Sequence, residues 1–244
     1  MRKVVLHSLI ILFISPNINA QSKHFAGIFP AIEHSGKISN KFQYTLSCSS
    51  NIPLINIQHP DITRDPYFLK FYSDAGLTYF FNQNFSFGLS YAYERVNVFL
   101  SNYTNENRVY LQAVYKQVLK SVSLKYRLRF DNRFVYNRKT NTAPYTHRLR
   151  ALVGVNVPIQ SKKNNLYFTG YEEAFFNTFK NASSVYGENK FYSAIGMKLN
   201  KINKIELGGL YQTVKLNKIN WFNQYYIAIS WISQLDFTRK NGAK

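Results

Sequence analysis

One segment near the middle of the chain carries an ionisable side chain at every second position. Between residues 122 and 136 these side chains are Lys125, Arg127, Arg129, Asp131 and Arg133. A period of two places them together on one face of a β-strand. Guanidinium and ammonium groups in such a row can pair with carboxylates of the protein itself or with a dissolved anion. The pattern therefore predicts either an internal ion-pair network or a path for anions.

Catalytic chemistry finds less support in the sequence. His147 begins a strand-like segment, but no Gly-x-Ser-x-Gly turn accompanies it to supply a nucleophile. Glu172 and Glu173 point to opposite faces of a regular strand, which makes them poor acid–base partners and leaves Glu172 on an apolar face unless a bulge re-aims it. The scattered histidines and the single Cys48 offer no metal-ligand spacing. We expect no metal, no cofactor and no enzymatic activity.

The elements that position the charged residues are long segments of alternating polarity, separated by polar, turn-prone stretches. They cover residues 25–33, 41–50, 70–81, 85–99, 108–118, 122–136, 145–158, 166–179, 188–199, 205–216 and 221–235. Most have about 11–15 residues, whereas a strand of a soluble protein has about 5–6. A tilted strand needs about 9–11 residues to cross a membrane. The segment lengths therefore favour the wall of a transmembrane barrel.

A soluble β-sandwich is the main structural alternative, because alternation alone permits it. Five ionisable groups on one face of residues 122–136 do not suit a dry sandwich core but do suit a water-bearing lumen. Connections also alternate between short ones, as at 82–84, and longer ones, as at 100–107, which is typical of membrane barrels. We predict an all-β, antiparallel, up-and-down barrel of about twelve strands, with residues 54–58 as the twelfth and ten strands as the fallback.

The first twenty residues have the layout of a secretory signal peptide. Arg2 and Lys3 precede a short apolar run, and Ala20 offers a cleavage site. We therefore divide the chain into a signal peptide (1–20), one outer-membrane barrel domain (21–237) and a polar tail (238–244). The last strand reaches Phe237, an aromatic end typical of substrates of the barrel-assembly machinery, although seven residues follow it.

The chain is strongly basic, with a formal net charge of +19. Without Arg2 and Lys3, 29 basic residues stand against 12 acidic ones, a net charge of +17. Such an excess is typical of nucleic-acid binding, but an exported chain without a basic tail argues against that partner. Lysines near the strand ends are expected to contact anionic headgroups of the outer-membrane lipid.

The alternation of side chains along each strand predicts which residues face the lumen. The predicted lining is Lys70, Asp74, Glu94, Arg108, Lys116, Lys125, Arg127, Arg129, Asp131, Arg133, Arg148, Arg150, Glu173, Asn177, Glu188, Lys190, Lys198 and Glu206. If the hairpins close at their loop centres, Asp131 faces Arg150, Arg150 approaches Glu173, and Asn177 faces Lys190. Most of the arginines would then serve to fill and stabilise the interior.

Five segments in order carry a family resemblance: YRLRFDNRF (126–134), HRLRALVGVNVP (147–158), YEEAFFN (171–177), ENKFYSAIGMKL (188–199) and IELGGLYQ (205–212). Over roughly residues 108–232 the chain resembles an uncharacterised bacterial outer-membrane barrel family, domain of unknown function twenty-four-ninety. Glu172 and Lys190 stand where that family tends to have Asn and Arg. The resemblance implies an outer-membrane barrel and no known reaction.

Together these features predict an outer-membrane barrel with a basic lumen stabilised by ion pairs. One alternative is an anion-selective channel for small acidic solutes, such as acidic oligosaccharides. A second is an outer-membrane lipid-modifying enzyme. A third, surface adhesion, has only short outer loops to support it.

Overall fold

The computed structural model describes residues 23–56, 69–159, 165–178, 185–215 and 220–238. The predicted signal peptide and nearly all of the predicted tail lie outside these ranges. The described residues form eleven strands: β1 (Lys23–Lys37), β2 (Phe42–Asn56), β3 (Lys70–Phe80), β4 (Phe85–Val96), β5 (Thr104–Leu119), β6 (Val122–Asn137), β7 (Tyr145–Pro158), β8 (Leu166–Asn177), β9 (Tyr186–Lys198), β10 (Asn203–Lys215) and β11 (Trp221–Asp236). The described residues include no helix whose length and apolar content would let it span a bilayer.

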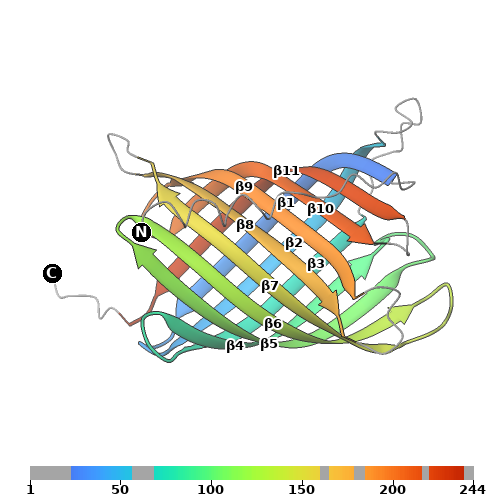
Figure 1. The fold of residues 1–244 in the computed structure, drawn as a ribbon, viewed down its shortest axis with the longest axis horizontal. Helices are drawn as coiled ribbons and strands as arrows, with labels where there is room; N and C mark the ends of the chain where they lie inside the picture. The colour runs from blue at the N-terminus through green and yellow to red at the C-terminus, as the bar shows by residue number, and fades with distance from the viewer. Residues whose placement is uncertain (1–22, 57–68, 160–164, 179–184, 216–219, 239–244) are drawn as a thin grey trace.

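The strands form one closed barrel in which each is hydrogen-bonded to its neighbours in the sequence (Figure 1). Closure comes from β1 and β11, which pair in parallel from Lys23 opposite Phe222 to Lys37 opposite Asp236. All other pairs are antiparallel. A wholly antiparallel ring needs an even number of strands, but one parallel pair lets an odd number close without a free edge.

The predicted count of twelve strands is therefore wrong, as is the fallback of ten. Residues 54–56 do not form a strand of their own but extend β2 beyond Pro53. The register of β1 and β2 shifts between Ala26 and Gly27, where Gly27 lies opposite Pro53. A Cβ atom on Gly27 would lie 2.1 Å from the carbonyl oxygen of Ile52, so only glycine fits this bulge.

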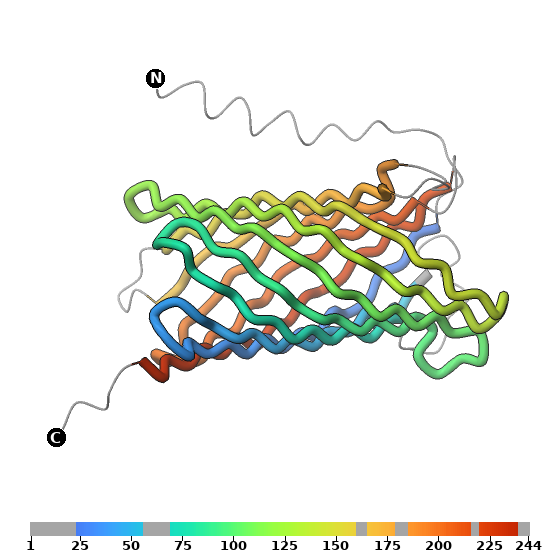
Figure 2. Tube along the Cα trace, turned by 90° about the horizontal axis from the view of Figure 1, so that it is seen from below, coloured from blue at the N-terminus to red at the C-terminus, as the bar shows by residue number. Residues whose placement is uncertain are grey.

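Connections differ between the two ends of the barrel. We call the end with the β1–β2, β3–β4, β5–β6, β7–β8 and β9–β10 connections the short-turn end, and the opposite end the long-loop end (Figure 2). Asparagine side chains shape two of the short turns. Asn82 accepts backbone hydrogen bonds from Asn84 and Phe85 at 2.9 and 2.7 Å, and Asn200 accepts from Ile202 and Asn203, both at 2.8 Å.

Parallel closure separates the ends of the wall. β1 begins at the long-loop end, whereas β11 ends at the short-turn end (Figure 2). An even number of strands, as predicted, would instead have brought both ends of the wall to the same side. The predicted loop at 100–107 is also too long, because β5 begins at Thr104.

Side chains alternate between the two surfaces of the wall. In β4 the exposed residues are the aromatic and aliphatic ones, such as Leu89, and the buried ones are small, such as Ser90 and Ala92. Part of the interior is packed by an apolar cluster from β9 to β11, made of Tyr192, Ala194, Leu210, Tyr226 and Ala228. Beside it Tyr167 and Tyr192 donate hydrogen bonds to Glu206 at 2.8 and 2.7 Å. The ion pairs of the interior lie on strands β3 to β9.

Candidate functional site

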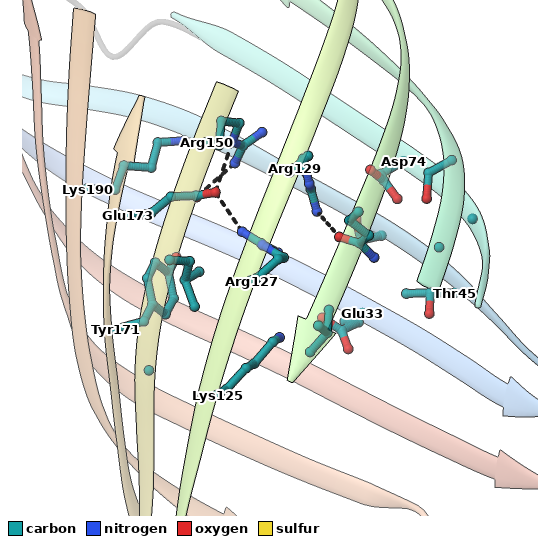
Figure 3. Close-up of a pocket in the computed structure, with 18 of the residues that line it drawn as sticks. Glu33, Thr45, Asp74, Lys125, Arg127, Arg129, Arg150, Tyr171, Glu173 and Lys190 are labelled. Atoms are coloured by element: carbon teal, nitrogen blue, oxygen red, sulfur yellow. Dashed lines mark hydrogen bonds and ion pairs between the residues drawn. The ribbon is translucent and has the colours of Figure 1, made fainter. Parts of the chain in front are cut away.

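The candidate site is the charged interior of the barrel, where arginines of one strand meet carboxylates of another. Glu173 of β8 accepts two hydrogen bonds from Arg150 of β7, at 2.9 Å from Nε and 2.8 Å from Nη2 (Figure 3). The Nη2 atom of Arg127, on β6, lies 2.7 Å from the same carboxylate. The Glu173 side chain is only 3% exposed. Two cations on one buried carboxylate offset the cost of removing all three charges from water.

Asp131 is a second junction, and it is completely buried. Its Oδ2 atom lies 3.2 Å from Nη2 of Arg148, 3.7 Å from Nη1 of Arg150 and 3.7 Å from Nε of Arg108. These arginines come from β7 and β5, the two neighbours of β6. One aspartate therefore ties three strands together on the inner face.

Glu106 is a third junction, which the sequence analysis missed. It accepts hydrogen bonds from Arg133 at 2.8 and 2.6 Å and pairs with Arg108 at 2.5 Å. The prediction placed residue 106 in a loop, although its spacing of two from Arg108 was a signal for the same face of a longer strand. The Nη2 atom of Arg108 also lies 3.7 Å from Oε2 of Glu94, and Oε1 of Glu94 lies 3.4 Å from Nζ of Lys70.

Polar contacts also join strands on the other side of the interior. Asn51 of β2 donates to Gln212 of β10 at 3.4 Å, past the two intervening strands β1 and β11. Gln212 donates to Glu188 at 2.8 Å, and Glu188 lies 3.5 Å from Arg148 and 3.5 Å from Lys190. We call the connected ionic residues the charged belt: Lys70, Glu94, Glu106, Arg108, Arg127, Asp131, Arg133, Arg148, Arg150, Glu173, Glu188 and Lys190.

An aromatic ring lies among the cations of the belt. Phe175 of β8 is 1% exposed, and its ring centroid lies 4.9 Å from Cζ of Arg148, 4.4 Å from Cζ of Arg150 and 5.4 Å from Nζ of Lys190. The negative face of an aromatic ring attracts cations, most strongly where water is excluded. Phe175 was not among the predicted site residues, because alternation along a strand does not distinguish a cation-binding ring from apolar filling.

Toward the short-turn end the belt borders a cavity of about 660 Å³. Gln43, Phe80 and Ser123, which lie beside the short turns, line it together with Arg127, Arg129, Arg148 and Arg150 of the deeper interior. Its lining has nine basic and five acidic residues. Figure 3 shows Lys125, Arg127 and Arg129 pointing into this space from β6, with Glu33 across from Lys125.

The predicted lining residues are found at four places in the barrel. Arg108, Lys125, Arg127, Arg129, Arg148, Arg150, Glu173 and Lys190 line the cavity. Asp131 and Arg133 lie within the belt. Glu206 accepts hydrogen bonds from Tyr167 and Tyr192, and Asn177 lies opposite Arg148 at the end of β8.

The predicted strand registers are partly wrong. Asp131 lies opposite Arg148, two residues from the predicted Arg150, although Arg150 still reaches it diagonally at 3.7 Å. The contact of Arg150 with Glu173 is present, at 2.8 Å. Lys190 lies opposite Glu173 and not Asn177. The β6–β7 hairpin does not close at its loop centre, and a register shift between Phe175 and Phe176 offsets β8 from β9.

His147 and Glu172, the residues outside the belt considered for catalysis, each contact an asparagine. The Nδ1 atom of His147 lies 3.1 Å from Oδ1 of Asn132, and the His147 ring contacts the rings of Phe130 and Tyr145. No bulge re-aims Glu172, whose carboxylate instead accepts a hydrogen bond from Asn189 at 3.0 Å. The described residues also contain no group of three or more His, Cys, Asp or Glu side chains suited to a metal ion.

Comparison with known proteins agrees with the sequence resemblance and extends it. No curated protein matches the chain. A family model described as protein of unknown function (DUF2490) matches residues 30–223, so the match begins in β1, far before the segments that carried the resemblance. This range covers most of the barrel wall and all three junctions of the belt. The chain therefore belongs to the family described as protein of unknown function (DUF2490).

Proposed function

We propose that this protein is a non-enzymatic outer-membrane β-barrel whose lumen is closed by the charged belt. The observation that carries the proposal is the belt itself, a set of buried ion pairs that joins strands from β3 to β9 across the interior. The remaining cavity extends to residues beside the short turns, and the short-turn end of an outer-membrane barrel faces the periplasm.

The outer surface supports a membrane environment. Every strand exposes at least one large apolar side chain: Ile32, Leu46, Leu77, Leu89, Leu111, Leu128, Val153, Phe168, Ile195, Leu207 and Ile227. A soluble protein rarely exposes an apolar surface of more than a few hundred Å². Apolar side chains outward and polar side chains inward, around a closed wall, are the arrangement that lipid requires.

The route to the membrane follows from both ends of the chain. Residues 1–20 supply an export signal, and Phe237, which directly follows β11, would serve the barrel-assembly machinery. Lysines near the strand ends would contact anionic lipid headgroups.

Fractionation of cells that express the whole chain tests the location. We expect the protein in the outer-membrane fraction after a carbonate wash, shortened by about twenty residues at a signal-peptidase site. Folded barrels resist detergent, so unheated samples should migrate differently from heated ones on a gel. Recovery in the soluble periplasmic fraction would disprove the membrane location.

Planar-bilayer recording tests the closure. If the belt closes the lumen as proposed, the wild type should give no steady current, and current should appear after Arg108, Asp131 and Arg148 are together replaced by Ala. Glu172→Gln, on the outer face beside Glu173, is the matched control and should stay silent. A steady ohmic current from the wild type would contradict the closed state.

A second candidate function is anion passage, and the excess of basic residues in the cavity lining favours it. It predicts a gated, anion-selective current that falls when Arg127 and Arg129 are replaced by Gln. Current of equal size for anions and cations would argue against this candidate.

A further inference from the structure

Two lysines face each other on the inner wall of the barrel. Lys116 of β5 and Lys125 of β6 are direct cross-strand partners, and both line the cavity. Like charges in this position destabilise a sheet. Neither ammonium group makes an ion pair within the described part of the chain. The pair thus sets up a local positive potential at the short-turn end of the cavity.

Arg127 and Arg129 continue this row into the barrel. Arg127 uses its Nη2 atom for Glu173, whereas Arg129 donates from Nη2 to the neutral Gln112 at 2.9 Å and stacks on the ring of Tyr110 at 3.8 Å. Arg129 makes no ion pair with any described residue. The Nε atoms of both arginines are buried without a hydrogen-bond partner, so each guanidinium keeps a donor that its protein partners do not use.

Burial increases along the row from the mouth of the cavity inward. Lys116 is exposed, Lys125 is half-buried, and Arg129 is 7% exposed. A charge attracts an anion more strongly as water is removed around it. An anion entering from the short-turn end would therefore meet a positive potential that strengthens with depth.

Carboxylates of the cavity lining do not neutralise this wall. Glu94, Glu173 and Glu188 are already paired in the charged belt, and Asp74 accepts hydrogen bonds from Tyr72 and Tyr110. Glu33, on the facing wall, lies across the cavity from Lys125 (Figure 3). One carboxylate stands against three cations, Lys116, Lys125 and Arg129, that lack an ion pair among the described residues.

We infer that this wall, defined as Lys116, Lys125, Arg127 and Arg129, is a binding site for a small oxyanion that carries two or more negative charges, such as a phosphate or polycarboxylate group. We call it the anion wall. The cavity of about 660 Å³ is in the range of small-molecule sites. The site goes beyond the proposed closure, because it would bind an anion whether or not the lumen conducts.

Calorimetric titration with sodium pyrophosphate tests the site on the protein purified in a non-ionic detergent. We expect saturable binding to the wild type and an affinity reduced about tenfold or more in Lys125→Gln, because one charged hydrogen bond is lost. Glu33→Gln should tighten binding. Lys201→Gln, in the exposed β9–β10 turn at the same end, is the matched control and should leave the affinity unchanged.

Folding is checked separately by the migration difference between unheated and heated samples. If Lys125→Gln does not fold, Lys116→Gln at the exposed rim takes its place with the same expectation. An absence of pyrophosphate binding to the wild type, or equal affinity in the wall variants and the wild type, would overturn the anion wall. Neither result bears on the bilayer recordings that test closure.

Adding phosphatidylglycerol to the micelles distinguishes the source of the phosphate. If the ligand is a dissolved anion, the affinity for pyrophosphate should remain unchanged, because the site lies inside the barrel and away from the lipid. Competition by the lipid, lost again in Lys125→Gln, would assign the site to a headgroup and overturn the dissolved ligand.

Discussion

The charged belt and the anion wall share strands β5 and β6, yet they treat positive charge in opposite ways. In the belt each buried arginine meets at least one carboxylate, as Arg150 meets Glu173 at 2.8 Å. In the anion wall Lys125 lies opposite another lysine. Buried charge is tolerated in a protein when it is paired. The belt therefore meets the needs of the fold. Of the anion wall, only Arg127 belongs to the belt as well, through Glu173, whereas Lys116, Lys125 and Arg129 carry charge that no ion pair among the described residues compensates.

The same contrast separates the two ends of the barrel. The belt fills the interior nearer the long-loop end, and the cavity with the anion wall lies nearer the short-turn end. A solute that enters from the short-turn end would meet cations without an ion pair first and the charged belt behind them. Such an interior suits binding from one side more than free passage through both.

The largest expected effect comes from breaking the belt at Glu173. Glu173→Ala leaves Arg127 and Arg150 buried without their carboxylate and should lower the free energy of unfolding by about 3–5 kcal/mol. Urea titration of the barrel in detergent, followed by fluorescence, measures it. Glu172→Ala on the outer face is the matched control and should cost about 1 kcal/mol. If both variants lose the same free energy of unfolding, the belt does not stabilise the barrel more than an outer-face contact does.

A smaller loss is expected at the aromatic centre of the belt. Phe175→Leu keeps an apolar side chain but removes the ring that three cations face, so the free energy of unfolding should fall by about 2 kcal/mol. Phe176→Leu, the next residue on β8, should change it by less than about 1 kcal/mol. If both variants lose the same stability in the urea titration, volume and not the ring is what matters at position 175.

The smallest effect should have the opposite sign and sharpen the comparison. Lys125→Gln relieves the repulsion with Lys116 and should raise the free energy of unfolding by about 0.5 kcal/mol in a dilute, anion-poor buffer. Added salt should remove the gain, because it screens the pair. Urea titrations at two ionic strengths measure it. A loss of stability at low salt would mean that Lys125 has a counter-charge in the fold and belongs with the belt.

Much of the wall follows from the sequence alone, because its signal is local. Alternation of large apolar and small residues from Phe85 onward determines which face of β4 is outside, and the bounds of β7, Tyr145–Pro158, agree with those predicted. Charge at every second position of β6 likewise sets the inner face. Length and alternation require no knowledge of the rest of the chain, so these features could be recognised residue by residue.

Strand number and register depended on contacts distant in sequence. The parallel pairing of β1 with β11 joins residues about two hundred positions apart, and no local pattern indicates it. The register of β6 against β7 decides which side chains meet, since a difference of two residues places Arg148 and not Arg150 opposite Asp131. The bulge at Gly27 and the register shift at Phe175 likewise set the pairing of β1 with β2 and of β8 with β9. The sequence by itself determined a basic inner face on a closed wall. Only the tertiary structure decided which of its charges find a partner, because pairing depends on the register between strands and on reach across the lumen, and neither is a property of a single strand.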